Sequence, residues 1–178
     1  MKFSEMKYER PDLAAVKDEL HALTERLKAA RDYAEAREAF LAHEAAYIHM
    51  ETQATLASVR HTIDTRDEFY DAEETFWNAA TPELDAYEDA WKGTMLESPF
   101  RKEFAAEYGD LMFVNAEIAR KAFSPEIIPE SQQENDLSQA YSKLIASAQI
   151  PFEGGVYTIS QLSPFKNYPD DARRLAAW

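Results

Sequence analysis

Two stretches of the sequence carry side chains that could do chemistry. The first is the run HEAAY at residues 43–47, which resembles the zinc-binding pattern HExxH except that tyrosine replaces the second histidine. In that pattern two histidines share one face of a helix and hold the metal, while the glutamate activates a water molecule. Tyrosine is a poor zinc ligand, and His49 lies six residues from His43, on another side of a helix. We therefore expect no metal site in this run.

The second stretch is RHTIDTRDEFYDAEETFW at residues 60–77. Its carboxylates recur every three or four residues, which places them along one face of a helix, with aromatic side chains toward the other face. One interpretation is an exposed acidic stripe opposite a buried stripe. A second is that a peptide or a neighbouring domain is held by Arg60, His61, Arg66 and Tyr70. A third is that the arginines form ion pairs within the helix, each contributing about 0.2–0.5 kcal/mol.

Other catalytic patterns are not found in the sequence. The chain has no cysteine, which excludes disulfides, thiolate zinc sites and thiol nucleophiles. No serine lies in a nucleophile-elbow motif, and no glycine-rich loop could hold a phosphate. A di-iron helical bundle needs paired Glu-x-x-His steps, and Asp18 with His21 is the only near approach. We expect no catalytic residue, metal ligand or cofactor within this chain.

The overall charge limits the classes of partner. There are 33 acidic and 19 basic residues, giving a net charge of −14, which would repel a nucleic-acid backbone. No run of 18 apolar residues could span a membrane, and the charged first ten residues do not resemble a signal peptide. We expect a cytoplasmic protein that binds neither nucleic acid nor membrane.

The elements that must position these side chains are mostly helices. Pro11 suits the first position of a helix of about 20 residues, followed by a longer helix over residues 33–64. Asp32 and Glu35 have the spacing of a capping box at its start. A helix of that length extends about 45 Å, more than a compact domain needs. A third helix begins near Asp67 and is expected to restart or kink at Pro82, after Thr81 as its cap.

Shorter elements follow. Cap-and-proline signals predict helices at about 99–108, 110–122 and 131–148. Two apolar runs at 149–152 and 156–159, around Gly154-Gly155, predict a β-hairpin, and a last helix begins near Asp170. The expected fold is mainly all-α, an elongated multi-helix lobe with one short β-hairpin near the C-terminus. We expect a helical lobe at 1–148, a hairpin and connector at 149–165, and the start of a further helix at 166–178.

That last helix is short for one that must be stable alone, since isolated helices need about 12–15 residues. Leu175 and Trp178 begin an apolar face that has no continuation in the sequence. We therefore expect that the chain is part of a longer protein and that the helix enters a further domain.

Several sequence blocks resemble a known family, in the same order. They are ATLASVRHTIDTRDEFYDAEETFW (54–77), LESPFR (96–101), KAFSPEIIPE (121–130), LIASAQIPFEGGVYTISQLSPF (144–165) and the closing DDARRLAAW. Together they resemble the amino-terminal region of the oligoendopeptidase F group, within the thimet-oligopeptidase-like zinc metallopeptidases. The resemblance covers nearly the whole chain.

The resemblance implies a large helical enzyme that cuts short peptides inside a deep channel. Its zinc is held by an HExxH helix and a later glutamate, both far downstream of the matched region, so the HEAAY run is not that motif. The chain would then be a non-catalytic lobe that forms a wall of the substrate channel. Its partners would be its own catalytic domain and short peptides, and its apolar faces could also self-associate. The alternative is a free-standing helical interaction or scaffold protein.

Overall fold

The computed structural model describes residues 2–178, which form two compact units. The first unit ends at Gln133, and the second runs from Glu134 to Trp178. The mainly helical fold with a single hairpin is confirmed within these residues. The expected domain boundary after residue 148 stays a prediction. No helix in the described part of the chain is long and apolar enough to cross a membrane.

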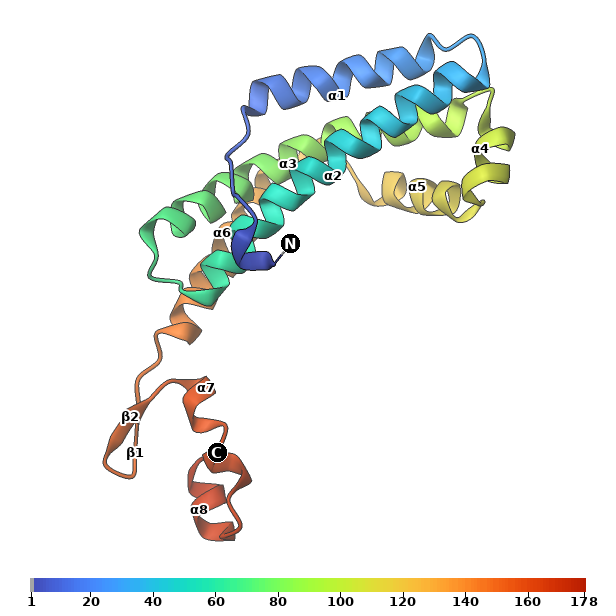
Figure 1. Ribbon diagram of the computed structural model, residues 1–178. Helices are drawn as coiled ribbons and strands as arrows, with labels where there is room; N and C mark the ends of the chain where they lie inside the picture. The colour runs from blue at the N-terminus through green and yellow to red at the C-terminus, as the bar shows by residue number, and fades with distance from the viewer. Residues whose placement is uncertain (1) are drawn as a thin grey trace. The chain divides into compact units, whose positions relative to one another are not determined.

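Three long helices form the body of the first unit and run alongside one another (Figure 1). They are α1 (Leu13–Lys28), α2 (Tyr33–Ile63) and α3 (Glu68–Glu97). Two shorter helices, α4 (Arg101–Tyr108) and α5 (Leu111–Ala122), follow and also pack on α3. The 3-10 turns η1 (Phe3–Glu5) and η2 (Pro125–Ile127) lie before α1 and before α6 (Ile128–Ala146), which crosses into the second unit.

An aspartate caps the start of each long helix. The side chains of Asp12, Asp32 and Asp67 accept hydrogen bonds from backbone N–H groups in the first turns of α1, α2 and α3. Such caps satisfy donors that have no partner inside the helix. Pro11 thus precedes the cap of α1 and is not the first helical residue as expected. Glu35 reaches back to the backbone N–H of Arg31, one residue before the predicted capping-box partner.

Of the two expectations at Pro82, the restart of the third helix is wrong, and the kink stays a prediction. Helix α3 is continuous from Glu68 to Glu97, with Pro82 inside it. A proline in a helix interior removes one backbone hydrogen bond and costs about 3 kcal/mol. Pro82 is itself buried, and Ala80 and Leu84 on either side of it belong to the same hydrophobic cluster. Packing on both sides of the proline therefore stabilises the continuous helix.

Two hydrophobic clusters fill the first unit. One contains Leu20 from α1, Met50 and Ala57 from α2, and Trp77, Ala80 and Leu84 from α3. The other joins α1 to α5 through Leu27, Ala36, Ala39, Phe40, Trp91, Met95, Phe104 and Phe113. The rings of Phe104 and Phe40 lie 5.4 Å apart, and Phe104 is fully buried. All five helices up to α5 thus contribute side chains to the two clusters.

The second unit contains the end of α6 and the hairpin of β1 (Ile150–Phe152) and β2 (Gly155–Tyr157). The turn residues Glu153 and Gly154 have φ angles of 46° and 80°, so one predicted glycine takes positive φ and Gly155 lies in the strand. The second strand is shorter than predicted, because Thr158 caps α7 (Ile159–Leu162). Phe152 and Tyr157 pack on the ring of Phe165, in the 3-10 turn η3 (Phe165–Asn167) before α8 (Asp171–Ala176).

Replacing Leu20 with alanine should test the core around α1. Leu20 is 2% exposed, so Leu20→Ala should lower the free energy of unfolding by about 2–5 kcal/mol, from lost burial and a residual cavity. Leu111→Ala is the matched control, since Leu111 is 68% exposed and its truncation should change stability by less than about 0.5 kcal/mol. Urea unfolding followed by circular dichroism measures both. Equal effects of the two variants would contradict this packing.

Candidate functional site

Within the HEAAY run, His43 is the residue that the structure buries in the interior of the first unit. His43 is 1% exposed, and its ring stacks on that of Trp91 with centroids 3.9 Å apart. Its Nε2 lies 3.0 Å from Oε1 of Glu88, whose side chain is 8% exposed. Among residues 2–178 no three histidine, aspartate or glutamate side chains gather in a way that could hold a metal ion. His43 thus has a packing role between α2 and α3.

The protonation of His43 follows from that environment. Burial lowers the pKa of His43, but the nearby carboxylates of Glu44 and Glu88 raise it by more, so the pKa lies above its ordinary value. The charged imidazolium is therefore favoured in the folded chain, where it compensates a buried carboxylate.

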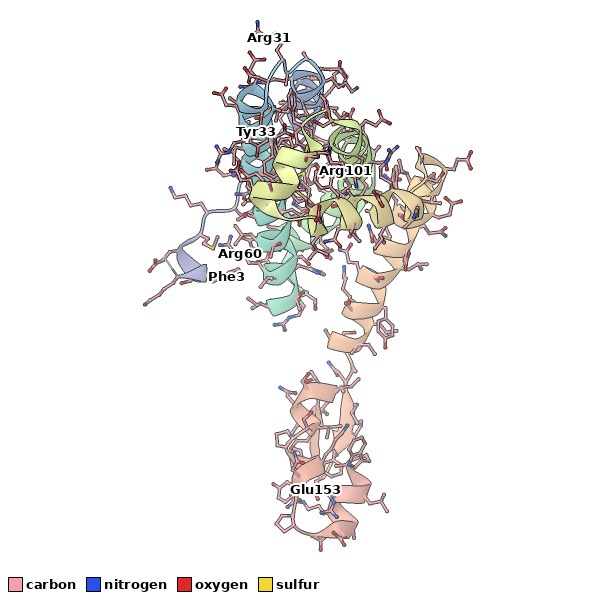
Figure 2. The ribbon with its side chains drawn as sticks, turned by 90° about the vertical axis from the view of Figure 1, so that its right-hand side faces the viewer. Phe3, Arg31, Tyr33, Arg60, Arg101 and Glu153 are labelled. Atoms are coloured by element: carbon pink, nitrogen blue, oxygen red, sulfur yellow. The ribbon has the colours of Figure 1, made fainter. Side chains whose placement is uncertain are left out.

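Two of the four predicted contact residues, Arg60 and Tyr70, come together. Arg60 Nη1 donates to Tyr70 Oη at 2.6 Å, and its guanidinium lies 5.5 Å from the centre of the Tyr70 ring. The same guanidinium lies 5.7 Å from the Phe3 ring and donates to the backbone oxygen of Met6 (Figure 2). Arg60 thus ties the N-terminal segment to the end of α2 and the start of α3.

The other two predicted residues, His61 and Arg66, have different partners. His61 is 3% exposed, with Nε2 3.3 Å from Oδ1 of Asp71. The Arg66 side chain is 88% exposed and pairs with Asp64 two residues earlier, at 2.9 Å. The Arg66–Asp64 ion pair is local, but it lies in the turn between α2 and α3 and not within a helix as expected, whereas Arg60 contacts the distant Met6.

A partly buried hydrogen-bond network around Glu73 was not predicted from the sequence. Glu73 accepts two hydrogen bonds from Arg10, at 2.8 and 2.7 Å, and one from the Tyr8 hydroxyl. Trp77 Nε1 donates to Tyr8 Oη at 3.1 Å. Burial, and then Glu73, raise the pKa of Tyr8 to about 12, while the hydrogen bond from Arg10 lowers the pKa of Glu73. More than 60 residues separate the partners, so no local pattern signals this contact.

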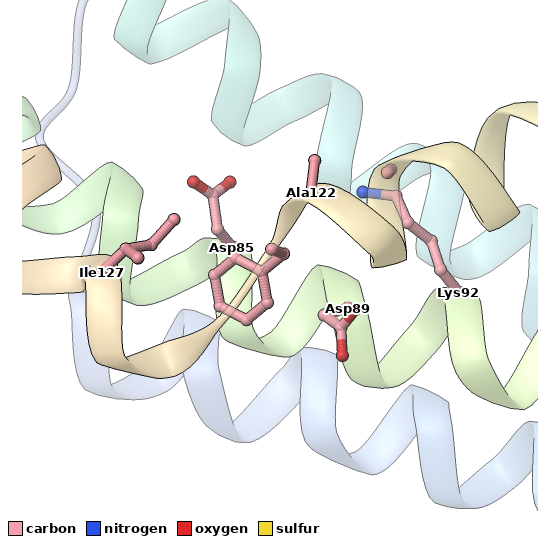
Figure 3. A pocket seen from close by; sticks show the side chains of 7 residues that line it. Asp85, Asp89, Lys92, Ala122 and Ile127 are labelled. Atoms are coloured by element: carbon pink, nitrogen blue, oxygen red, sulfur yellow. The ribbon is translucent and has the colours of Figure 1, made fainter.

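A cavity of about 350 Å³ lies between α3, α5 and η2 (Figure 3). Asp85, Asp89 and Lys92 line it from α3, and Ala122 and Ile127 are among the residues of its other wall. Arg120 Nε lies 3.2 Å from Oδ1 of Asp89. A side chain at Gly93 would meet this guanidinium at 2.8 Å, so glycine permits its close approach. The lining offers charges of both signs, from the carboxylates of Asp85 and Asp89 and the ammonium group of Lys92.

Arg60 and Arg66 provide a matched pair for testing these assignments. Arg60→Ala removes two hydrogen bonds from a charged donor and should lower the free energy of unfolding by about 1.5–3 kcal/mol. Arg66→Ala removes only an exposed local pair and should change it by less than about 0.5 kcal/mol. Urea unfolding of the two variants measures the difference. A larger loss of stability in Arg66→Ala than in Arg60→Ala would show that the long-range role was assigned to the wrong arginine.

The raised pKa of His43 predicts a pH dependence of stability. Its contribution is complete below the unfolded-state pKa, about 6.5, and is lost as pH rises through the folded-state pKa. Glu44 and Tyr47 on α2, with Glu88 and Trp91 on α3, face the ring. We expect the free energy of unfolding to fall from pH 6 to pH 8 in the native sequence and in His49→Gln. The fall should be smaller in His43→Gln; an equal fall in all three would refute the assignment.

Comparison with known proteins places this arrangement in a family. Residues 3–123 match the family model described as the peptidase M3 N-terminal domain. A solved structure assigned as an oligoendopeptidase F is 38% identical, with a TM-score of 0.95. PZ peptidase A with an inhibitor is 36% identical with a TM-score of 0.94, and an oligoendopeptidase F from Bacillus anthracis strain Ames is 33% identical with a TM-score of 0.94. The comparison with curated proteins gives no match.

The matches cover almost all of this chain but only part of each matched structure. Each covers 99% of this chain but only 31–32% of the matched structure. The chain therefore spans about a third of the length of the proteins it resembles. Because the family model matches more than half of the chain and the identity exceeds 30%, the kinship extends beyond a shared fold. The chain belongs to the peptidase M3 N-terminal domain family.

Proposed function

We propose that this chain is the non-catalytic, N-terminal helical lobe of a zinc-dependent oligoendopeptidase, in which it forms a wall of the channel that admits short peptides. The observation that carries the proposal is the TM-score of 0.95 at 38% identity over 99% of the chain, against 31% of the matched oligoendopeptidase F. A wall of this kind acts as a steric filter, since it decides which peptides enter and takes no part in bond cleavage.

The zinc belongs to another part of the whole enzyme in this proposal. The residues of this chain do not fit a zinc site: His43 is stacked on Trp91 inside the core, and no group of three suitable ligands gathers in residues 2–178. The catalytic domain would supply the metal, the general base and the reacting groups.

The proposed partner is that catalytic domain. Helix α6 exposes an apolar stripe in the second unit, at the spacing of one helical face, formed by Leu137, Tyr141 and Leu144 at 64%, 65% and 68% exposure. In the same unit Leu175 and Trp178 are 76% and 81% exposed. Apolar side chains gathered in this way usually mark an interface, and we propose that the catalytic domain covers them. In the absence of that domain they would promote self-association.

The N-terminal network suggests a supporting role for Arg60 and Tyr70. Arg60 donates to Tyr70 at the start of α3 and to the backbone oxygen of Met6, so it links α3 to the N-terminal segment. We propose that the pair shapes a surface for the neighbouring domain and does not hold the peptide itself. The proposal also includes a cytoplasmic location, consistent with a chain that has no cysteine.

If the metal and the reacting groups belong to the catalytic domain, the isolated chain should be inactive. The purified 178-residue chain should hold only substoichiometric zinc by mass spectrometry and should not cleave a quenched bradykinin-like peptide. Adding back the catalytic segment should restore zinc binding and cleavage, and His43→Gln should leave that restored metal content unchanged. If the chain alone hydrolyses the peptide in a chelator-sensitive way, it contains its own active site and the proposal fails.

A further inference from the structure

A second cavity in the first unit has the composition of a site for an organic cation. It lies between α2, α3 and α5, has a volume of about 320 Å³, and is here called the Trp91 pocket. Its walls combine two carboxylates, Glu44 and Glu88, with the aromatic rings of Phe40, Tyr47 and Trp91. Carboxylates beside aromatic rings bind ammonium and guanidinium groups, through charge and through the electron-rich ring faces.

The Glu88 carboxylate lies beside the His43 ring but lacks a well-formed hydrogen bond at Oε1 among residues 2–178. Glu88 is 6% exposed and lines the pocket, yet its Oε1 has no hydrogen-bond donor among residues 2–178. His43 Nε2 lies 3.0 Å from this oxygen, but both ring nitrogens of His43 also lack a hydrogen bond of acceptable geometry. A buried carboxylate is costly unless donors satisfy its oxygens, and most buried polar groups have a partner. The geometry leaves Glu88 incompletely satisfied in the wall of an open pocket.

The electrostatic surroundings favour a positive ligand. The pKa of Tyr47 is raised, first by burial and then by the charges of Glu51, Glu88 and Asp85. Two basic groups, Lys92 and His43, lie beside the pocket, but the four acidic side chains of Glu44, Glu51, Asp85 and Glu88 outnumber them. The net charge of −14 would further attract cations to this surface.

We propose that the Trp91 pocket binds a small organic cation, with an ammonium, amidinium or guanidinium head group on an apolar stem. The head group donates to Glu88 and Glu44, and the stem lies against the aromatic and methionine side chains of the walls. Met95 and Met112, which also line the pocket, suit an apolar stem because the thioether adapts to its shape.

The test is a titration of the intact chain with three probes of the same shape. Benzamidinium carries the positive charge, benzamide is its neutral analogue, and benzoate is negative. Benzamidinium should bind with one-to-one stoichiometry by calorimetry and should shift the Trp91 indole N–H signal in nitrogen-15 spectra. The indole signal of Trp77, which is bonded to Tyr8 in the other cluster, should stay in place. Equal binding of benzamide would overturn the proposal.

Three variants distinguish binding in this pocket from general attraction of cations to an acidic protein. Glu88→Gln and Glu44→Gln should each weaken benzamidinium binding by about tenfold or more, since each removes a charged acceptor. Glu97→Gln is the control, because this exposed carboxylate on the same helix lies outside the pocket and its loss should change affinity less than twofold. Circular dichroism checks folding, and Glu44, being only half-buried, keeps the test valid if Glu88→Gln unfolds. Unchanged affinity in a folded Glu44→Gln variant would refute the site.

Discussion

The structure of the first unit depends on one constraint, the burial of helix α3 on several sides. Helices α1, α2, α4 and α5 all pack on it, and it contributes Trp77 and Leu84 to one hydrophobic cluster and Trp91 and Met95 to the other. A helix covered in this way also buries polar side chains, which then need partners. Glu73 has Arg10 and Tyr8, and Glu88 has the close approach of His43. The N-terminal segment and the HEAAY run are therefore held by carboxylates of α3.

The sequence patterns that proved reliable are local ones. Apolar spacing predicts α1 and α2, and Asp32 correctly marks the start of α2, because a cap acts within one helical turn; at α1 the cap is Asp12, and Pro11 precedes it. The same local reasoning fails at Pro82, where buried neighbours in α3 maintain a helix that proline alone would interrupt. It also misses the contact of Arg10 with Glu73, which depends on how distant segments pack. Of the predicted contact residues, Arg60 and Tyr70 meet, but their spacing alone could not distinguish them from Arg66.

The missing metal motif and the family assignment agree with each other. His43 lies in a helix of a chain related to metallopeptidases, where it could be taken for a zinc ligand. Its ring is instead stacked on Trp91. The matched structures are about three times as long as this chain, as the 31% coverage implies. In the proposed function, the part of the enzyme outside this chain cleaves the peptide. The helices of this chain limit which peptides reach it. Exposed apolar side chains on α6 are consistent with a lobe that packs on another domain.

The most direct measurement is a domain replacement in the oligoendopeptidase F that is 38% identical to this chain. This chain would replace the matching N-terminal third, and hydrolysis of a short quenched peptide would be followed with and without a chelator. If the chain is the peptidase lobe, the chimera should bind zinc and cleave the peptide, whereas the remainder without any N-terminal lobe should not. A folded, zinc-loaded chimera that is inactive, or a remainder as active as the intact enzyme, would contradict the account.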